Sequence, residues 1–154
     1  MKTFEELKEE LLIRAKNAGA CQAGYAMGLR SNTKSDLLKA ITENWFWVLR
    51  SAKIVDAKYL EDNFTEEELS EAGIYIRNTH EVRTVSFACG SATVKAYDSA
   101  TVKAYGSATV EAYDNSYVED CTGNVRPQSG YAIVKDYHSH KIYIKKGNFE
   151  IIEV

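Results

Sequence analysis

The sequence predicts an α+β fold in which an N-terminal helical bundle precedes a short parallel β-solenoid. Two observations support this prediction. The stretch from Gly90 to Tyr113 is one octapeptide written three times, Ser-Ala-Thr-Val-Lys/Glu-Ala-Tyr after a Gly or Asp, and such a tandem repeat indicates units that bury their inner face by stacking. The earlier residues carry helix signals instead. We therefore expect a helical region over 1–73 and a repeat solenoid with capping strands over 74–154.

The parity of the repeat separates an inner from an outer face. Successive side chains of a strand point to opposite faces, and eight is an even number, so each octad position keeps its face in every copy. The two alanines and the valine share one face, which is small, apolar and suited to a thin stacked interior. The Ser, Thr, Lys or Glu, and Tyr side chains share the other face, which suits water or a partner.

The corner residues between octads predict the length of one coil. Gly90, Asp98, Gly106 and Asp114 alternate, so a coil of two octads stacks glycine on glycine along one edge and aspartate on aspartate along the other. One coil is therefore expected to contain sixteen residues.

The charged positions favour the same coil. In a two-octad step Lys95 lies over Glu111, and Lys103, Glu119 and Lys135 form a ladder of alternating sign. A one-octad step would place Lys95 on Lys103, and like charges directly opposite each other destabilise a sheet.

An antiparallel β-meander is the alternative fold for this region. A two-residue turn between octads is excluded, because it would pair Ala96 with Ser99 and set an apolar face against a polar one. A three-residue turn would pair Ala96 with Ala100 and restore the parity. The meander therefore stays open beside the solenoid.

Less regular sequence flanks the repeats. The octad register breaks at Thr122–Ser129, which holds the single proline of the chain and is expected to be an edge, bulge or loop. The register returns at Gly130–Tyr137, and Phe149–Val154 is expected to be a last strand. Upstream, Ile74–Ile76 and Val82–Cys89, the latter with alternating apolar residues, are expected to be capping strands.

Capping signals and helical periodicity place the helices of the first region. Thr3 and Glu6 form a capping box before an apolar stripe at helical spacing, and another box begins at Thr65. Ser35 is expected to cap a long second helix. The expected helices cover Phe4–Gly19, a short segment within Ala20–Leu29, Ser35 to about Arg50, Asp56–Asn63 and Thr65–Gly73.

Composition excludes several classes of protein. The 154 residues are 45% apolar, which is ordinary for one compact domain or two intimate halves. No run approaches membrane-spanning length and the N-terminus lacks the apolar core of a signal peptide, so no membrane partner is expected. Three widely spaced cysteines argue for a reducing, cytoplasmic location. The net charge of −3 provides no basic stripe, so direct nucleic-acid binding is not expected.

Residues that could carry chemistry are few. His138 and His140 would share one strand face and could bind zinc with Cys89, Cys121 or His80, but no Cys-x-x-Cys or other closing pair of known spacing is present. His138 is interpreted as a corner residue. Nucleophile elbows, phosphate loops and dinucleotide fingerprints are absent as well. We therefore predict no metal, no cofactor and no catalytic residue, and the chain is expected not to be an enzyme.

Two features of the helical region could contact a partner. Glu66 and Glu67 belong to an acidic run that could imitate a phosphate backbone. A solvated helix face is the favoured interpretation, since acids in a first turn interact favourably with the helix dipole. Trp45, Phe46 and Trp47 present more aromatic surface than one helix face can bury. Trp45 is therefore expected in the core, with Phe46 or Trp47 over the junction with the β region or on a partner surface.

The order of these parts resembles a known group of proteins. A short helical region containing Ala-Lys-Asn-Ala-Gly-Ala-Cys-Gln-Ala-Gly-Tyr, ending at Tyr25, precedes Ser-Ala-Thr-Val-x-Ala-Tyr octads. This order is similar to that of small uncharacterised proteins carried by bacteriophages and prophages of gut bacteria. The resemblance implies an accessory gene of a mobile element, a class that includes anti-CRISPR proteins and other inhibitors of host defence. It implies no catalytic residues.

The sequence leads to the hypothesis of a non-enzymatic protein-binding module, such as a phage-encoded inhibitor of a host defence protein. Tyrosine supplies a large contact area with few rotors. The candidate contacts are therefore Tyr97 with Tyr113 or, on the opposite side, Tyr105 with Tyr137. The alternative hypotheses are self-assembly into a homo-oligomer through an open solenoid end, and carbohydrate binding on the Tyr/Thr face.

Overall fold

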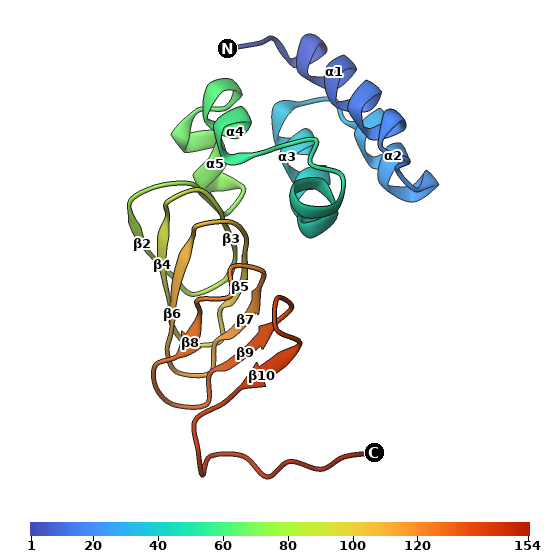
Figure 1. Ribbon diagram of the computed structural model, residues 1–154. Coiled ribbons are helices and arrows are strands. Elements are labelled where there is room, and N and C mark those ends of the chain that lie inside the picture. The colour runs from blue at the N-terminus through green and yellow to red at the C-terminus, as the bar shows by residue number, and fades with distance from the viewer. The chain divides into compact units, whose positions relative to one another are not determined.

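The computed structural model describes all residues from Met1 to Val154 and has the predicted α+β fold. The chain divides into two compact units, a helical unit (Met1–Ile74) and a β unit (Tyr75–Val154), whose elements are labelled in Figure 1. The helices are too short or too polar to cross a bilayer.

The helical unit consists of short helices joined by tight turns. α1 packs against α2, and α2 packs against α3. The elements are α1 (Phe4–Asn17), α2 (Gln22–Arg30), α3 (Lys34–Glu43), a π-helical turn η1 (Trp47–Ser51), α4 (Ala57–Asn63) and α5 (Glu66–Glu71).

The helix starts follow the capping chemistry of the sequence, with one correction. The boxes predicted at Thr3 and Thr65 are confirmed. The expectation that Ser35 caps α3 is wrong, because Thr33 is the cap: its hydroxyl accepts from the Asp36 amide at 3.1 Å, and the Asp36 carboxylate accepts from the Thr33 amide at 3.0 Å. A carboxylate three residues after the cap closes the box whether it belongs to Glu or to Asp.

The long second helix expected up to Arg50 is also wrong. α3 ends at Glu43, and Asn44 leaves helical geometry with φ −121° and ψ 29°. The Asn44 side chain donates from Nδ2 to the carbonyl of Ala40 at 2.9 Å, a local bond of the kind that competes with helix propagation. The chain then widens into the π-helical turn that begins at Trp47.

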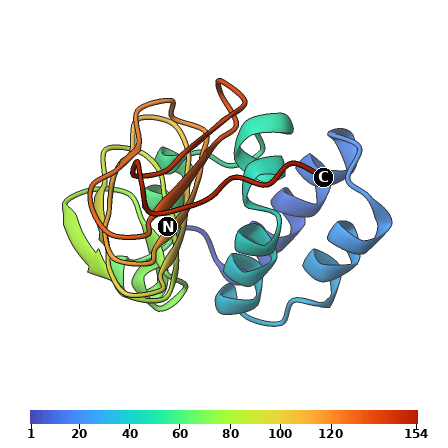
Figure 2. The same cartoon turned by 90° about the horizontal axis from the view of Figure 1, so that it is seen from below.

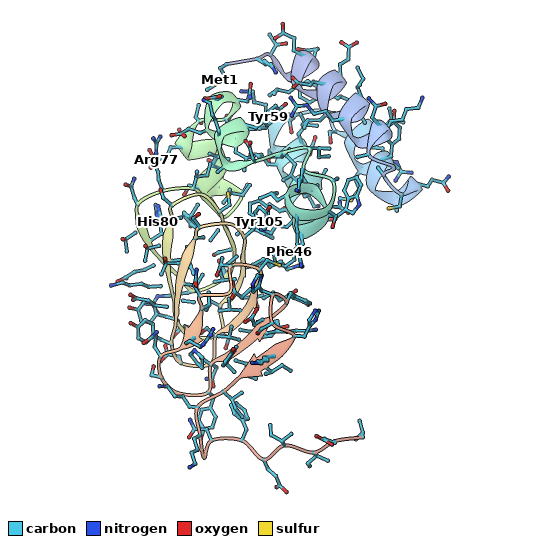
Figure 3. The ribbon with its side chains drawn as sticks, viewed as in Figure 1. Met1, Phe46, Tyr59, Arg77, His80 and Tyr105 are labelled. Atoms are coloured by element: carbon cyan, nitrogen blue, oxygen red, sulfur yellow. The ribbon has the colours of Figure 1, made fainter.

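Cationic side chains cover an aromatic residue in the core of the helical unit. Tyr59 of α4, labelled in Figure 3, is buried, and the Lys2 ammonium and Arg14 guanidinium lie 5.4 Å and 4.7 Å from its ring centroid. Burial, followed by the charge of Glu10, raises the pKa of Tyr59 to about 12. Arg14 also donates to the carbonyl of Ile54 at 2.8 Å and so ties α1 to the segment before α4. Trp45 is 2% exposed, as predicted.

The β unit is a parallel β-solenoid. Successive strands alternate between two sheets, one in the order β1-β3-β5-β7-β9-β10 and the other in the order β2-β4-β6-β8. Figure 2, seen from below, shows the coils lying over one another. The strands are β1 (Ile74–Tyr75), β2 (Thr79–Val82), β3 (Val85–Ala88), β4 (Thr93–Ala96), β5 (Thr101–Ala104), β6 (Thr109–Ala112), β7 (Tyr117–Asp120), β8 (Arg126–Pro127), β9 (Ile133–Asp136) and β10 (Lys141–Tyr143).

The strand register confirms the sixteen-residue coil. Lys95 pairs with Glu111, and Lys103, Glu119 and Lys135 form one ladder, all between parallel strands. The antiparallel meander is therefore excluded for the repeats. Only β10 pairs antiparallel, with β9.

The interior of the solenoid is a stack of alanine and valine. The inward positions of the octads are buried and form one apolar cluster. The corners adopt the left-handed conformation, with φ 55° at Asp98, 51° at Asp114, 61° at Gly90 and 73° at Gly106. Glycine and, among other residues, aspartate tolerate this conformation, which explains why these two residue types alternate there.

The last two coils depart from the apolar interior. Asp120 and Asp136, one and two coils after Ala104, take the same inward position as that alanine, and both are buried. Asp136 accepts hydrogen bonds from the His138 and Ser139 amides at 2.8 Å and 3.1 Å and from the Ser139 hydroxyl at 2.7 Å. Sequence parity marked these positions as inner, but their use as buried turn caps was not predicted.

The flanking strands confirm one prediction and correct two. Thr122–Ser129 contributes β8 at the edge of the smaller sheet, as predicted. In β3, which lies within the predicted capping strand Val82–Cys89, the register places Ser86 on the inner face beside Val102. Val85 points outward and is 57% exposed. Phe149–Val154 forms no strand and is exposed, and the six-stranded sheet ends at β10 instead.

Candidate functional site

A stacked pair of tyrosines lies on the outer side of the four-stranded sheet. The rings of Tyr97 and Tyr113, hereafter the tyrosine pair, are 5.0 Å apart at their centroids and inclined by only 8°. Each tyrosine directly follows a strand, and its backbone amide donates to the coil before it, to Val82 or to Ala96, at 2.9 Å. The sixteen-residue coil therefore sets the spacing of the rings. Both side chains are half-buried.

Charged neighbours fix the orientation of the tyrosine pair. The Arg83 guanidinium lies 5.2 Å from the Tyr97 ring centroid and donates to Asp98 at 3.1 Å. The Tyr113 hydroxyl donates to the carboxylate of Glu111 at 3.0 Å, and this hydrogen bond raises the pKa of Tyr113. Arg83, Tyr97 and Tyr113 thus form a column of planar groups.

An acidic corner adjoins the tyrosine pair. Asp98 and Asp114, hereafter the corner aspartates, are exposed, and the amide of Asp98 donates to Oδ2 of Asp114 at 2.9 Å. Asp98 has an ion pair with Arg83. Asp114 has no basic partner in the chain, and its Oδ1 accepts no hydrogen bond, so this carboxylate is available to a partner.

The second predicted pair is not a stack. Tyr105, labelled in Figure 3, and Tyr137 belong to the six-stranded sheet, but Cys121 stands between them in the same column. The Tyr137 hydroxyl donates to Glu119 at 3.2 Å, and the Lys135 ammonium lies 4.9 Å from the Tyr137 ring centroid.

Tyr117 is an outward aromatic side chain that the sequence reasoning missed. It pairs with Thr101 in register, and burial, followed by the charge of Glu119, raises its pKa. It occupies an octad position held by threonine in the perfect repeats, so counting only the terminal tyrosines overlooked it.

The candidate residues of the helical unit have different environments. Glu66 and Glu67 are exposed in the first turn of α5. Trp47 is half-buried and lines an apolar pocket within the unit. Of the two tyrosine pairs predicted from the sequence, only Tyr97 and Tyr113 are in ring contact in the structure.

The histidines and cysteines do not assemble into a centre. His138 and His140 are exposed, and His80 forms a hydrogen bond at 2.8 Å with the carbonyl of Arg77. No three His, Cys, Asp or Glu side chains are grouped so that they could hold a metal ion. The three cysteines are free thiols.

Comparison of the chain with protein-family models, curated proteins and solved structures gave no match. Function is therefore inferred from the residues of this chain.

Proposed function

We propose that the protein is a non-enzymatic binding module that captures another protein with the tyrosine pair and the corner aspartates. The observation that carries the proposal is the stack of Tyr97 on Tyr113 at 5.0 Å. The rings are ordered before binding, so less side-chain entropy is lost when a partner covers them. Tyrosine is also enriched at protein interfaces.

The chemistry of the corner favours a partner with a basic protein surface. Arg83 makes an arginine contact of the proposed kind within this chain, because its guanidinium pairs with Asp98 and lies over the ring of Tyr97. One coil further on, Asp114 and Tyr113 offer a carboxylate and an aromatic ring without such an arginine. An arginine of the partner is proposed to pair with Asp114 and to contact Tyr113 in the same manner.

The proposed biological role is inhibition of a host protein. Proteins that bind nucleic acids carry basic surfaces, and a module that covers such a surface would block its use. The resemblance of the octads to phage and prophage proteins supports a role against host defence, as in anti-CRISPR proteins.

The proposal is tested by capture of a host protein with matched variants. Tyr97→Ser with Tyr113→Ser should weaken capture by more than about 30-fold, since one aromatic anchor typically contributes about 2 kcal/mol or more. Tyr105→Ser with Tyr137→Ser is the matched control and should retain capture. Affinity is measured with the purified partner, and circular dichroism checks the fold of each variant.

Removal of a single charge provides an independent variant. Asp114→Asn should weaken capture strongly because it removes the carboxylate charge, while asparagine still tolerates the left-handed corner and keeps a side-chain oxygen for the Asp98 amide. Glu67→Gln at an exposed position of α5 is the matched control and should leave capture unchanged. Loss of capture with Glu67→Gln but not with Asp114→Asn would contradict the proposed surface and assign recognition to the helical unit.

Self-assembly is a second candidate function, and one observation favours it. The C-terminal segment Phe149–Val154 exposes three aliphatic side chains, with Ile151 and Ile152 at 70% and 75% exposure. Light scattering on the full chain and on a chain ending at Gly147 distinguishes the two functions. A concentration-dependent mass that is lost with the segment would favour assembly.

A further inference from the structure

The helical unit contains an apolar pocket of about 220 Å³. α1, α2, α3 and the residues from the π-helical turn to Val55 surround it, and no charged side chain lines it. Gly19 and Cys21, at the turn between α1 and α2, are exposed members of the lining. The pocket therefore reaches the surface at this turn.

Small residues and the π-helical turn keep the pocket open. Ala15 of α1, Gly24 of α2 and Ala40 of α3 line it, and none of them fills space. At Gly28 a Cβ atom would lie 3.2 Å from Leu12, so the helices already approach closely there. Trp47, the first residue of the π-helical turn, lines the pocket too, and such turns recur at functional sites.

Asn44 supplies an available acceptor in this apolar wall. Its Nδ2 donates to the carbonyl of Ala40 at 2.9 Å, which fixes the orientation of the amide. Its Oδ1 accepts no hydrogen bond from the chain and lies 3.5 Å from where a Cβ atom of Gly24 would stand. The thiol of Cys21, at the same distance from that position, accepts from the Gly24 amide.

We propose that this pocket binds a small uncharged aromatic molecule of about two fused rings, with one N–H or O–H group directed to Asn44 Oδ1. An aliphatic cavity of about 150 Å³ holds benzene, so the larger pocket here accepts a second ring. An ionised ligand would lose its hydration without a countercharge. Apolar walls with a few placed polar groups are typical of small-molecule sites. This activity is independent of protein capture by the β unit.

Indole and 1-methylindole are the probes that test the pocket on the full chain. Both compounds have fused rings, but only indole carries an N–H donor. We expect saturable binding of one indole per chain by calorimetry. 1-Methylindole should bind about fivefold or more weakly, because a single hydrogen bond contributes about 1 kcal/mol. Amide chemical shifts should change around Gly24 and Trp47.

Variants that fill the pocket distinguish it from other surfaces. Ala15→Leu and, separately, Ala40→Leu should abolish indole binding while circular dichroism stays unchanged, because each places a branched side chain in the cavity. Ala23→Leu, at an exposed position of α2 outside the lining, is the matched control and should bind indole normally. Absence of saturable indole binding to the wild-type chain would overturn the proposal. Indole binding by both filled variants with wild-type affinity would overturn it as well. Equal affinity for the two probes would overturn the role of Asn44.

Discussion

The two units fill their interiors in different ways. In the β unit, the alanines and valines at the inward positions of the perfect octads stack between neighbouring coils and are buried. In the helical unit, large side chains such as Trp45 and Leu60 pack between helices of unrelated sequence, and a pocket of about 220 Å³ that reaches the surface remains between the helices. Repetition thus closes an interior with small side chains, whereas irregular packing leaves space that a ligand can use.

The largest expected effect comes from a charge inside the repeat stack. Val102→Asp should unfold the β unit with a loss of more than about 4 kcal/mol, because the fully buried Val102 side chain lies where a carboxylate finds neither water nor a partner. Urea unfolding followed by circular dichroism measures the loss.

The adjacent outward position is the control for that change. Lys103→Glu should cost about 1 kcal/mol or less, since it exchanges a screened surface charge. Comparable losses from Val102→Asp and Lys103→Glu would contradict the separation into inner and outer faces.

Two buried serines, one in each unit, differ in their hydrogen bonding. Ser116 is buried at the position of Ala100, and its hydroxyl has no hydrogen-bond partner. Ser31 of the helical unit is equally buried, but its hydroxyl donates to the Met27 carbonyl at 3.0 Å. Ser116→Ala should therefore stabilise the protein by about 1 kcal/mol, and Ser31→Ala should destabilise it by a similar amount. Thermal unfolding of both variants checks the opposite signs.

The smallest expected effect is a pH dependence of the last coil. Burial raises the pKa of Asp136, but hydrogen bonds from Ser139 and His138 outweigh it, so the net pKa lies below the ordinary value of 3.8. A lowered folded-state pKa stabilises the fold above that ordinary value, and the stabilisation is lost as pH falls through the folded-state pKa.

Asp136→Asn isolates this contribution. The variant should lose less stability than the wild type when urea unfolding midpoints at pH 6 and pH 3 are compared. An unchanged difference between the two pH values would show that Asp136 is not the responsible group.

The repeat explains why so much of the β unit could be predicted from sequence. The alternating corner residues and the alternating charges both favoured the register in which Lys95 pairs with Glu111, and the structure has that register. The same regularity predicted the contact of Tyr97 with Tyr113. It did not predict that Tyr105 and Tyr137 would be separated, because Cys121, which lies between them in the column, falls outside the perfect octads.

The unpredicted features have different causes. The cap of α3 at Thr33 is a local signal, and its prediction required recognising Asp36 as the second half of a capping box. The π-helical turn at Trp47 has no simple periodic signal. The pocket depends on how α1, α2 and α3 pack around it, which is a non-local property that a single sequence does not display.

The two-octad coil also constrains how the gene for this protein can change length. Short tandem repeats in DNA gain and lose copies when the polymerase slips. Duplication of one lysine octad would move every later strand to the opposite sheet and set the new lysine over Lys95. Slippage by two octads keeps each later strand in its sheet. Tolerated length variants should therefore differ by whole coils, so the fold itself filters which replication errors persist.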